Sequence, residues 1–285
     1  MKKSAGDRVF SIVSVIFICM LSAGLLFPLI MTVSVSLQTM DEIYSADAVI
    51  LPGKLMFSNY RDALSNGNWP RYFMNSAFVT LVTVAISLVI NSMAGYVFAR
   101  IPFKGRQPLF MLILLGMMVP AQVTLIPVFS LLRNMRFLGG GSSGLINTYA
   151  GLILPYIAGS FGVFLCRQFY ISFPYELDDA AMIDGCGRFR TYISIYLPLS
   201  GPVLASLGVL KFTGTWNEYT WPLVSTSGER LKTVQLALTS FRDEGEIYWN
   251  LLLAATLVVS LPIYAVFFFA QKHFVTGLLA GSVKS

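Results

Sequence analysis

Charged side chains are scarce in this chain of 285 residues. Asp, Glu, Lys and Arg make up 12% of it and hydrophobic residues 55%, whereas about a quarter of the residues in a soluble domain are charged. This composition excludes a water-soluble globular domain and predicts a membrane protein. The formal net charge of +6 does not indicate a nucleic-acid surface, because the Lys and Arg residues are scattered singly through the loops.

Groups that carry catalytic or metal chemistry are also few. Three cysteines without metal-like spacing and one histidine exclude a disulfide framework, a histidine metal cluster and a Ser-His pair. No G-x-x-x-x-G-K-S/T phosphate-binding loop is present, since Gly53-Lys54 lacks the upstream glycine. We therefore expect no enzyme and no cofactor bound by this chain. Any nucleotide chemistry, with its ATP and Mg²⁺, would therefore belong to another polypeptide.

Long hydrophobic runs predict an all-α, polytopic membrane protein. The first run is longer than the roughly 20 residues that span a bilayer and exceeds the hydrophobic region of a cleavable signal peptide, so it is read as a retained anchor. No internal repeat or soluble domain is visible, which predicts a single membrane domain over residues 1–285. Its six expected transmembrane helices cover about 9–37, 72–99, 108–132, 148–169, 199–223 and 249–271.

Positive charges set the expected orientation. Lys2, Lys3 and Arg8 precede the first span, and a short basic turn with Lys104 and Arg106 follows the second. Because cytoplasmic loops carry an excess of Lys and Arg, both segments are expected inside, with the N- and C-termini cytoplasmic. Polar and proline residues interrupt the third span, so we expect that span to face a partner or a pathway; they are Pro120, Gln122, Thr124 and Pro127.

A polar segment of about 172–198 separates the fourth and fifth spans. Its acidic residues follow Ser172, a candidate N-cap, and suit the positive end of a helix dipole. Gly185 is expected to end this first helix in the left-handed conformation. The first helix is predicted to have an apolar face of Leu177, Ala180 and Ala181. A second helix, which is expected to end at Pro198, is predicted to have an apolar face of Phe189, Tyr192, Ile193 and Tyr196.

Three parts of this segment resemble the EAA loop of membrane subunits of bacterial binding-protein-dependent ABC importers. They are Asp179-Ala180-Ala181, Asp184-Gly185 and Leu197-Pro198, with Asp179 in place of the family's Glu and one methylene shorter. The resemblance implies coupling helices that dock into a groove of a cytoplasmic ATPase. It assigns this coupling role to Glu176, Asp179, Ala180, Ala181, Asp184, Gly185 and Pro198. An amphipathic loop on the membrane surface is the alternative.

Further stretches resemble carbohydrate-type permeases of this class, namely residues 73–106, 119–129, 146–156 and 215–223. The resemblance implies a type I ABC importer permease fold in the bacterial inner membrane, and the smaller permease of a maltose-type or glycerol-phosphate-type system. A sugar, oligosaccharide or related polyol or glycerol phosphate is the implied cargo. The implied partners are a second, homologous permease subunit, two copies of the ATPase and an extracytoplasmic solute-binding protein.

An aromatic and polar cluster near the end of the fifth span is a candidate part of the translocation path; it consists of Trp216, Asn217, Glu218 and Tyr219, with Trp221 nearby. Aromatic rings stack on sugars, while amide and carboxylate groups accept their hydroxyl hydrogen bonds. The alternative is an interfacial aromatic belt in which Glu218 pairs with a charge on a partner helix. Lys211 is a candidate counter-ion for Glu218 or for a partner's acid.

Two other functions fit less well. A secondary carrier working alone would need a pair of intramembrane acids or an inverted pair of broken helices, and Glu218 is the sole acid within a predicted span. A membrane-embedded hydrolase would need a nucleophile and base, which the sequence does not offer.

Overall fold

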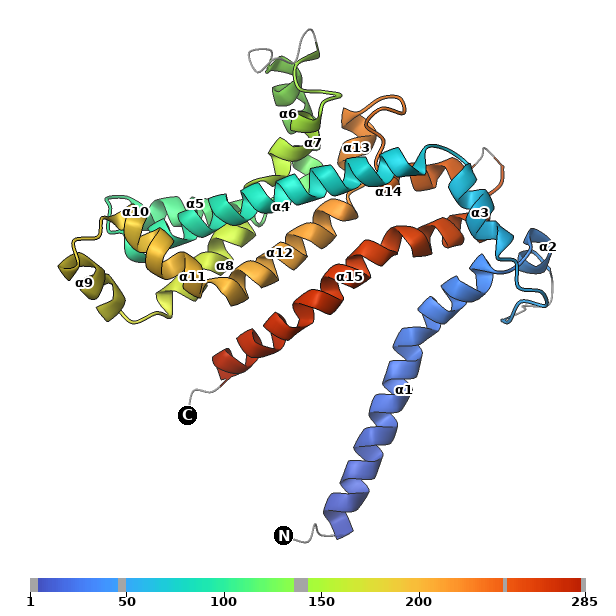
Figure 1. Ribbon diagram of the computed structural model, residues 1–285, viewed down its shortest axis with the longest axis horizontal. Coiled ribbons are helices and arrows are strands. Elements are labelled where there is room, and N and C mark those ends of the chain that lie inside the picture. Colours follow the sequence, from blue (N-terminus) through green and yellow to red (C-terminus); the bar gives the residue numbers. More distant parts are fainter. Residues whose placement is uncertain (1–4, 46–49, 136–142, 243–244, 283–285) are drawn as a thin grey trace. The chain divides into compact units, whose positions relative to one another are not determined.

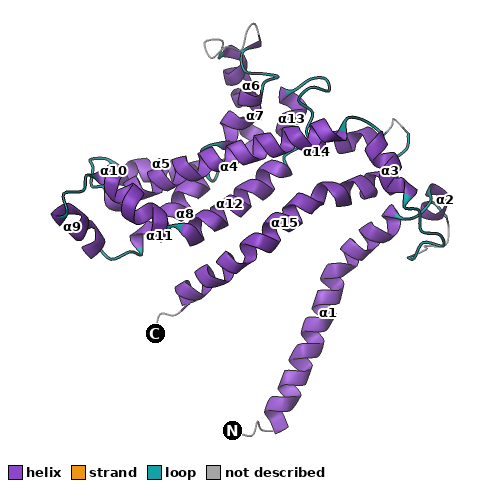
Figure 2. Ribbon diagram, viewed as in Figure 1, coloured by secondary structure: helices purple, strands orange, loops and turns teal. Residues whose placement is uncertain are grey.

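The computed structural model describes residues 5–45, 50–135, 143–242 and 245–282, with side chains described from 10 to 271. Over these residues the chain forms helices and loops and no strand, which confirms the all-α prediction (Figure 2). The chain divides into two compact units, residues 1–69 with 238–260 and residues 70–237 with 261–285. A single membrane domain stays a prediction.

Three helices are long and apolar enough to cross a membrane by themselves: α1 (Ala5–Ser36), α4 (Trp69–Arg100) and α15 (Trp249–Ser282) (Figure 1). Three bent helix pairs pass the same test together, and counting each pair as one span gives six among the described residues, as predicted. The pairs are α5 (Arg106–Gly116) with α6 (Ala121–Asn134), Tyr149–Tyr156 with α8 (Ser160–Ile171), and Arg188–Leu199 with α12 (Gly201–Trp216).

The first unit joins α1 to two short helices, α2 (Met40–Ile43) and α3 (Ser58–Ser65), and to η5 (Leu238–Phe241). The Thr39 and Glu42 side chains cap α2 reciprocally, so the pKa of Glu42 lies below its usual value through the backbone N–H of Thr39. Trp69 stacks on the buried ring of Phe241 with centroids 6.2 Å apart. The described residues of the first unit that follow α1 are therefore held by polar and aromatic contacts within that unit.

In the second unit, helix α4 packs closely on α8. A Cβ added at Gly95 would lie 2.5 Å from Cβ of Cys166, and one added at Gly162 would lie 2.7 Å from Cγ of Asn91. Small residues let membrane helices approach in this way. Oδ1 of Asn91 also accepts the backbone N–H of Gly159 at 3.2 Å, just before α8 begins.

The structure corrects two of the predicted spans. The third is two helices at 103°, because Pro120 is extended and starts α6 after the break. The fifth lacks a continuous helix to residue 223: α12 ends at Trp216, and α13 (Thr220–Ser225) follows a non-helical link. Glu218 therefore lies in a break between helices and not inside one.

The segment after α13 carries several charged residues, and the structure shows that part of it is packed. Leu231 and Val234 are fully buried. The Asn75 amide of α4 donates to the carbonyls of Arg230 and Lys232 at 3.1 and 2.9 Å. This segment, which includes α14 (Val234–Ala237), is thereby fixed to the first turns of α4.

Candidate coupling loop and intramembrane cavity

The predicted first coupling helix is α9, Glu176–Ile183. Three acidic side chains occupy its first turn, where they complement the helix dipole. The predicted N-cap is wrong, because Tyr175 occupies that position without a side-chain cap, and the Ser172 hydroxyl instead donates to the carbonyl of Phe169 at the end of α8. The acidic first turn takes the place of a capping hydroxyl.

The end of α9 is a Schellman motif. Gly185 has φ +70°, and its N–H donates to the carbonyl of Met182 at 3.1 Å. The N–H of Cys186 donates to the carbonyl of Ala181 at 2.8 Å, which completes the pattern. The prediction that Asp184-Gly185 ends this helix is confirmed.

The predicted apolar face of α9 is divided by the structure. Ala181 is buried, Leu177 is half-buried and Ala180 is exposed. The exposed surface of the loop combines Glu176, Asp179 and Asp184 with two large apolar side chains, Met182 and Ile183, the latter 86% exposed. This mixed acidic and apolar surface of α9 is called the docking face below.

The second helix of the loop runs from Arg188 to Leu199 through a π-helical turn at Tyr192–Tyr196. The wide turn rotates the predicted face, so Tyr192 and Tyr196 are buried while Phe189 and Ile193 are exposed. Pro198 does not end the helix, since a proline is accommodated in the first turn of a new helical segment. The bend comes at Ser200, with an angle of 78° between the flanking helices.

Arg100, the last residue of α4, connects this loop to the membrane helices. Nε of Arg100 lies 3.1 Å from Oδ2 of Asp178, and the same oxygen accepts the Tyr196 hydroxyl at 2.8 Å. Nη2 of Arg100 donates to the carbonyls of Phe173 and Pro174 at 3.0 and 2.7 Å. The arginine side chain is fully buried and that of Asp178 is 10% exposed, so this ion pair is shielded from water. We call Arg100, Asp178 and Tyr196 the clasp.

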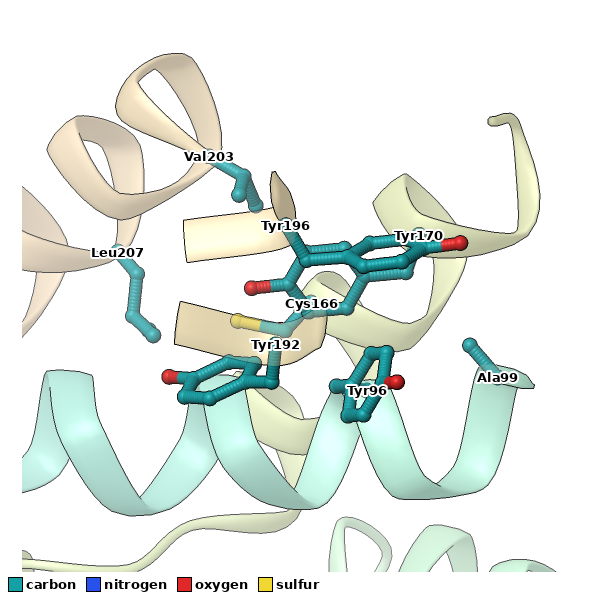
Figure 3. Packing of buried hydrophobic residues seen from close by; sticks show 8 residues of the cluster. All are labelled: Tyr96, Ala99, Cys166, Tyr170, Tyr192, Tyr196, Val203 and Leu207. Carbon is teal, nitrogen blue, oxygen red and sulfur yellow. The ribbon is translucent and has the colours of Figure 1, made fainter. Parts of the chain in front are cut away.

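Tyr196 of the clasp also belongs to a cluster of buried tyrosines with Tyr96, Tyr170 and Tyr192, here called the tyrosine cluster (Figure 3). Tyr96 of α4 packs against Tyr196 and Tyr192 with ring centroids 4.8 and 5.4 Å apart. Tyr170 of α8 meets the edge of Tyr196 at 5.6 Å, and its hydroxyl accepts a hydrogen bond from Ser200 at 2.8 Å. The coupling loop is thus anchored to α4 and α8 by buried aromatic rings.

A cavity of about 250 Å³ lies elsewhere in the second unit. Gln122 and Thr124 of α6 line it together with Glu218. That the proline-rich third span faces a partner or a pathway stays a prediction. Its other lining residues are Ala121, Leu125, Val128, Pro155, Tyr156, Thr220 and Trp221. The mixture of amide, hydroxyl, carboxylate and aromatic groups suits a polyhydroxylated ligand.

The predicted aromatic cluster is only partly brought together. Glu218 lines the cavity and accepts the N–H of Trp221 at 2.9 Å. Trp216 is buried and stacks on Phe212, whereas Asn217 pairs with Gln235. Tyr219 is 38% exposed and does not line this cavity.

Lys211 does not serve as the counter-ion of Glu218 in this structure. Its Nζ donates to the carbonyl of Tyr156 at 3.1 Å and lies against Gly159. Within the described residues, the ion pairs are Arg100 with Asp178 and Lys232 with Glu229. Lys211 therefore secures the break between η3 (Leu154–Tyr156) and α8.

Comparison with known proteins shows that the chain matches one protein family. The model of the family described as "Binding-protein-dependent transport system inner membrane component" matches residues 91–279, which include the coupling loop and the cavity. The chain belongs to this family.

Curated relatives of this permease cover nearly its whole length. The "Probable ABC transporter permease protein YurM" of Bacillus subtilis (strain 168) is 35% identical over 94% of this chain and 87% of the relative. The "Arabinooligosaccharides transport system permease protein AraQ" of the same organism is 32% identical over 100% and 99%. The "sn-glycerol-3-phosphate transport system permease protein UgpE" of Rhizobium meliloti (strain 1021) is 32% identical over 89% and 90%.

A solved structure supports the fold of the permease. It is the crystal structure of "a bacterial ABC transporter involved in the import of the acidic polysaccharide alginate", with a TM-score of 0.80 and 24% identity over 96% of this chain and 99% of that one. The likeness shows that the two chains share an ABC importer permease fold.

The sequence did not identify every residue of the permease that forms these sites. Asp178 is one of the acidic residues that suit the helix dipole, and Arg100 precedes the basic turn of Lys104 and Arg106, yet the two form a buried pair. The spacing between them, 78 residues along the chain, hid the contact. An arginine directly after a long apolar helix, with one acid on the buried side of a short helix, was the available signal.

Proposed function

We propose that this permease is one of two membrane subunits of an ATP-driven, binding-protein-dependent importer, and that α9 transmits the state of a separate ATPase to the membrane helices. The docking face carries the proposal, because Asp179, Met182 and Ile183 are exposed on a helix whose opposite side is anchored by the clasp. An apolar and acidic helical surface suits a groove with an apolar floor and basic rim. ATP and Mg²⁺ are bound by the ATPase in this proposal.

The proposed cargo is a sugar, an oligosaccharide or a glycerol phosphate. Relatives of this chain are named as permeases of arabinooligosaccharide, lactose and sn-glycerol-3-phosphate transport systems. The cavity supports the choice, since Gln122, Thr124 and Glu218 can bond hydroxyls while Tyr156 and Trp221 offer rings. The remaining proposed partners are a second, homologous permease and an extracytoplasmic solute-binding protein, with both termini of this chain in the cytoplasm.

In the proposed cycle, ATP binding closes the ATPase dimer and draws the coupling helices together. The membrane helices then tilt and open the cavity outward to receive solute, and hydrolysis resets them. This chain contributes the docking helix and part of the path, whereas the nucleotide chemistry belongs to the ATPase.

The test is co-purification of the ATPase with the permease pair, beside uptake of labelled arabinooligosaccharide, lactose and sn-glycerol-3-phosphate. We expect Asp179→Ala to weaken docking by about 1 to 3 kcal/mol, because it removes a charge-assisted contact that becomes desolvated on docking. Asp179→Glu should keep or improve docking, since it retains the charge. Asp62→Asn, an exposed acid far along the chain, is the matched control.

The purified chain by itself should neither hydrolyse ATP nor move any of these solutes in liposomes, because it lacks a phosphate-binding loop. Activity of the chain alone would refute the proposal. Unchanged ATPase co-purification in Asp179→Ala and in the helix-end variants described below would refute the docking role of α9.

A further inference from the structure

We infer that Arg100 and Asp178 are positioning residues that make α9 move together with α4, so that closure of the ATPase reaches the membrane helices through the clasp. The inference rests on the proposed function and assigns this step to residues outside the predicted coupling set. It identifies α4 as the helix to which the docking motion is delivered first.

Arg100 holds the loop at several points. Its guanidinium contacts the carboxylate of Asp178 and the carbonyls of Phe173 and Pro174, and it lies 4.5 Å from the centre of the Tyr175 ring. These contacts cover the chain entering α9 and the first turn of the helix itself. A planar guanidinium with fixed donor directions holds such a set more rigidly than a lysine would.

Two neighbouring carboxylates of α9 differ in their surroundings. Asp178 is buried in the clasp, whereas Asp179 is exposed on the docking face. Adjacent residues on a helix point in different directions, so the two acids lie on different sides of α9, one buried and one exposed. A force applied at Asp179 therefore reaches α4 across the width of one helix.

The buried ion pair is incompletely hydrogen-bonded. Within the described part of the chain, Nη1 of Arg100 and Oδ1 of Asp178 are buried without a hydrogen-bond partner. An incompletely satisfied buried ion pair is a poor source of stability compared with apolar packing, while fixing position is its best-attested use. The tyrosine cluster already supplies apolar packing between the loop and the membrane helices. The clasp adds hydrogen bonds of fixed direction, which set the position of α9 relative to α4.

A third attachment makes the clasp a junction of three elements. The Tyr196 hydroxyl donates to Asp178 and belongs to the helix that leads into α12. Displacement of α9 thus acts on α4 through Arg100 and on the following helix through Tyr196. A change that removes the clasp should leave docking intact and disconnect it from both helices.

The experiment follows the cavity without needing to know the solute. Gln122→Cys is introduced into a chain in which Cys19 and Cys186 are replaced by Ser, and the permease pair with its ATPase is purified in nanodiscs. The rate at which a membrane-impermeant maleimide labels residue 122 is measured without nucleotide and with ATP plus vanadate. Gln122 is exposed at the cavity, and the remaining Cys166 is fully buried.

We expect nucleotide to change the labelling rate in this background, and Asp178→Asn and Arg100→Gln to reduce that change at least about fivefold, the lower end of typical coupling factors. ATPase co-purification and ATP hydrolysis by the complex should persist. The double variant should behave like either single one, because the two side chains act as one unit. Glu229→Gln, which breaks the exposed ion pair with Lys232, is the matched control and should keep the full response.

A full nucleotide response in both single variants would overturn the inference. So would loss of ATPase binding together with an unaltered response in the complexes that still assemble, since that result describes a purely structural pair. If Asp178→Asn does not assemble, Arg100→Lys is used instead, because it keeps the positive charge but loses the planar array of guanidinium donors. The inference requires the same reduction of the nucleotide-dependent labelling change in Arg100→Lys. If the parent Gln122→Cys protein, with an intact clasp, shows no ATPase co-purification or no change in labelling with nucleotide, the result refutes the proposed function instead.

Discussion

Glu229 shows at the scale of one residue how the segment after α13 is held. Its carboxylate accepts the Tyr72 hydroxyl of α4 and lies 2.9 Å from Nζ of Lys232. These two partners, the Tyr72 hydroxyl first, hold the pKa of Glu229 below its usual value. The charged form is therefore favoured in the folded protein.

This residue predicts a small, pH-dependent effect. Glu229→Gln should lower the free energy of unfolding by less than about 1 kcal/mol near neutral pH, because the carboxylate is 61% exposed. A pKa lowered on folding gives stability that is fully present above the unfolded pKa and is lost as the pH falls through the folded pKa. Thermal unfolding in detergent should therefore separate wild type and variant at neutral pH and merge them below that pKa. A gap that stays constant over this pH range contradicts the assignment; Glu246→Gln is the control.

At the scale of the element, the end of α9 depends on backbone conformation and not on space. A Cβ at Gly185 would meet nothing within 4 Å, yet its φ of +70° is unfavourable for any residue with a side chain. Gly187, two residues on, has φ −70° and the same free space. Because Gly185 and Gly187 have the same free space and differ in φ, substitutions at the two positions separate conformational strain from steric clash.

Substitutions at Gly185 should reduce ATPase co-purification and uptake in a graded series. Asn, which tolerates the left-handed region, should have the mildest effect, Leu should cost about 1 to 2 kcal/mol of strain at the helix end, and Pro should be worst. Proline adds a fixed φ and removes the N–H that bonds Met182. Gly187→Ala should behave as wild type. Equal effects of Gly185→Leu and Gly187→Ala would show that the αL position has no role.

Over the whole molecule, orientation in the bilayer remains to be tested. The predicted topology places the turn between α4 and α5 in the cytoplasm and the segment after α13 outside, on the evidence of Lys and Arg distribution. A cysteine at Lys104 should therefore resist an impermeant maleimide in intact cells, and one at Ser227 should react. Labelling of residue 104 alone would invert the topology. Cells opened before labelling provide the control that both sites are reactive.

Sequence reasoning recovered the helices and the coupling loop because both depend on local signals. Apolar length predicts a span, and Asp184-Gly185 carries its own conformational information. The break at Asn217–Tyr219 escaped prediction, because no proline or glycine marks it. The clasp escaped as well, since a buried ion pair depends on which residues meet after the helices pack.

Helix α4 contacts the segment after α13 near one end, at Asn75, and carries Arg100 at the other. It is continuous over 32 residues, which at 1.5 Å per residue gives a length of about 48 Å, well beyond the roughly 30 Å of bilayer hydrocarbon. In a rigid helix of that length, a small rotation gives a large displacement at the far end. If α4 pivots by about 5° about one end, the other end moves by about 4 Å, close to the rise of three residues. A small change in the angle of α4 is thus enough to displace its far end by about 4 Å.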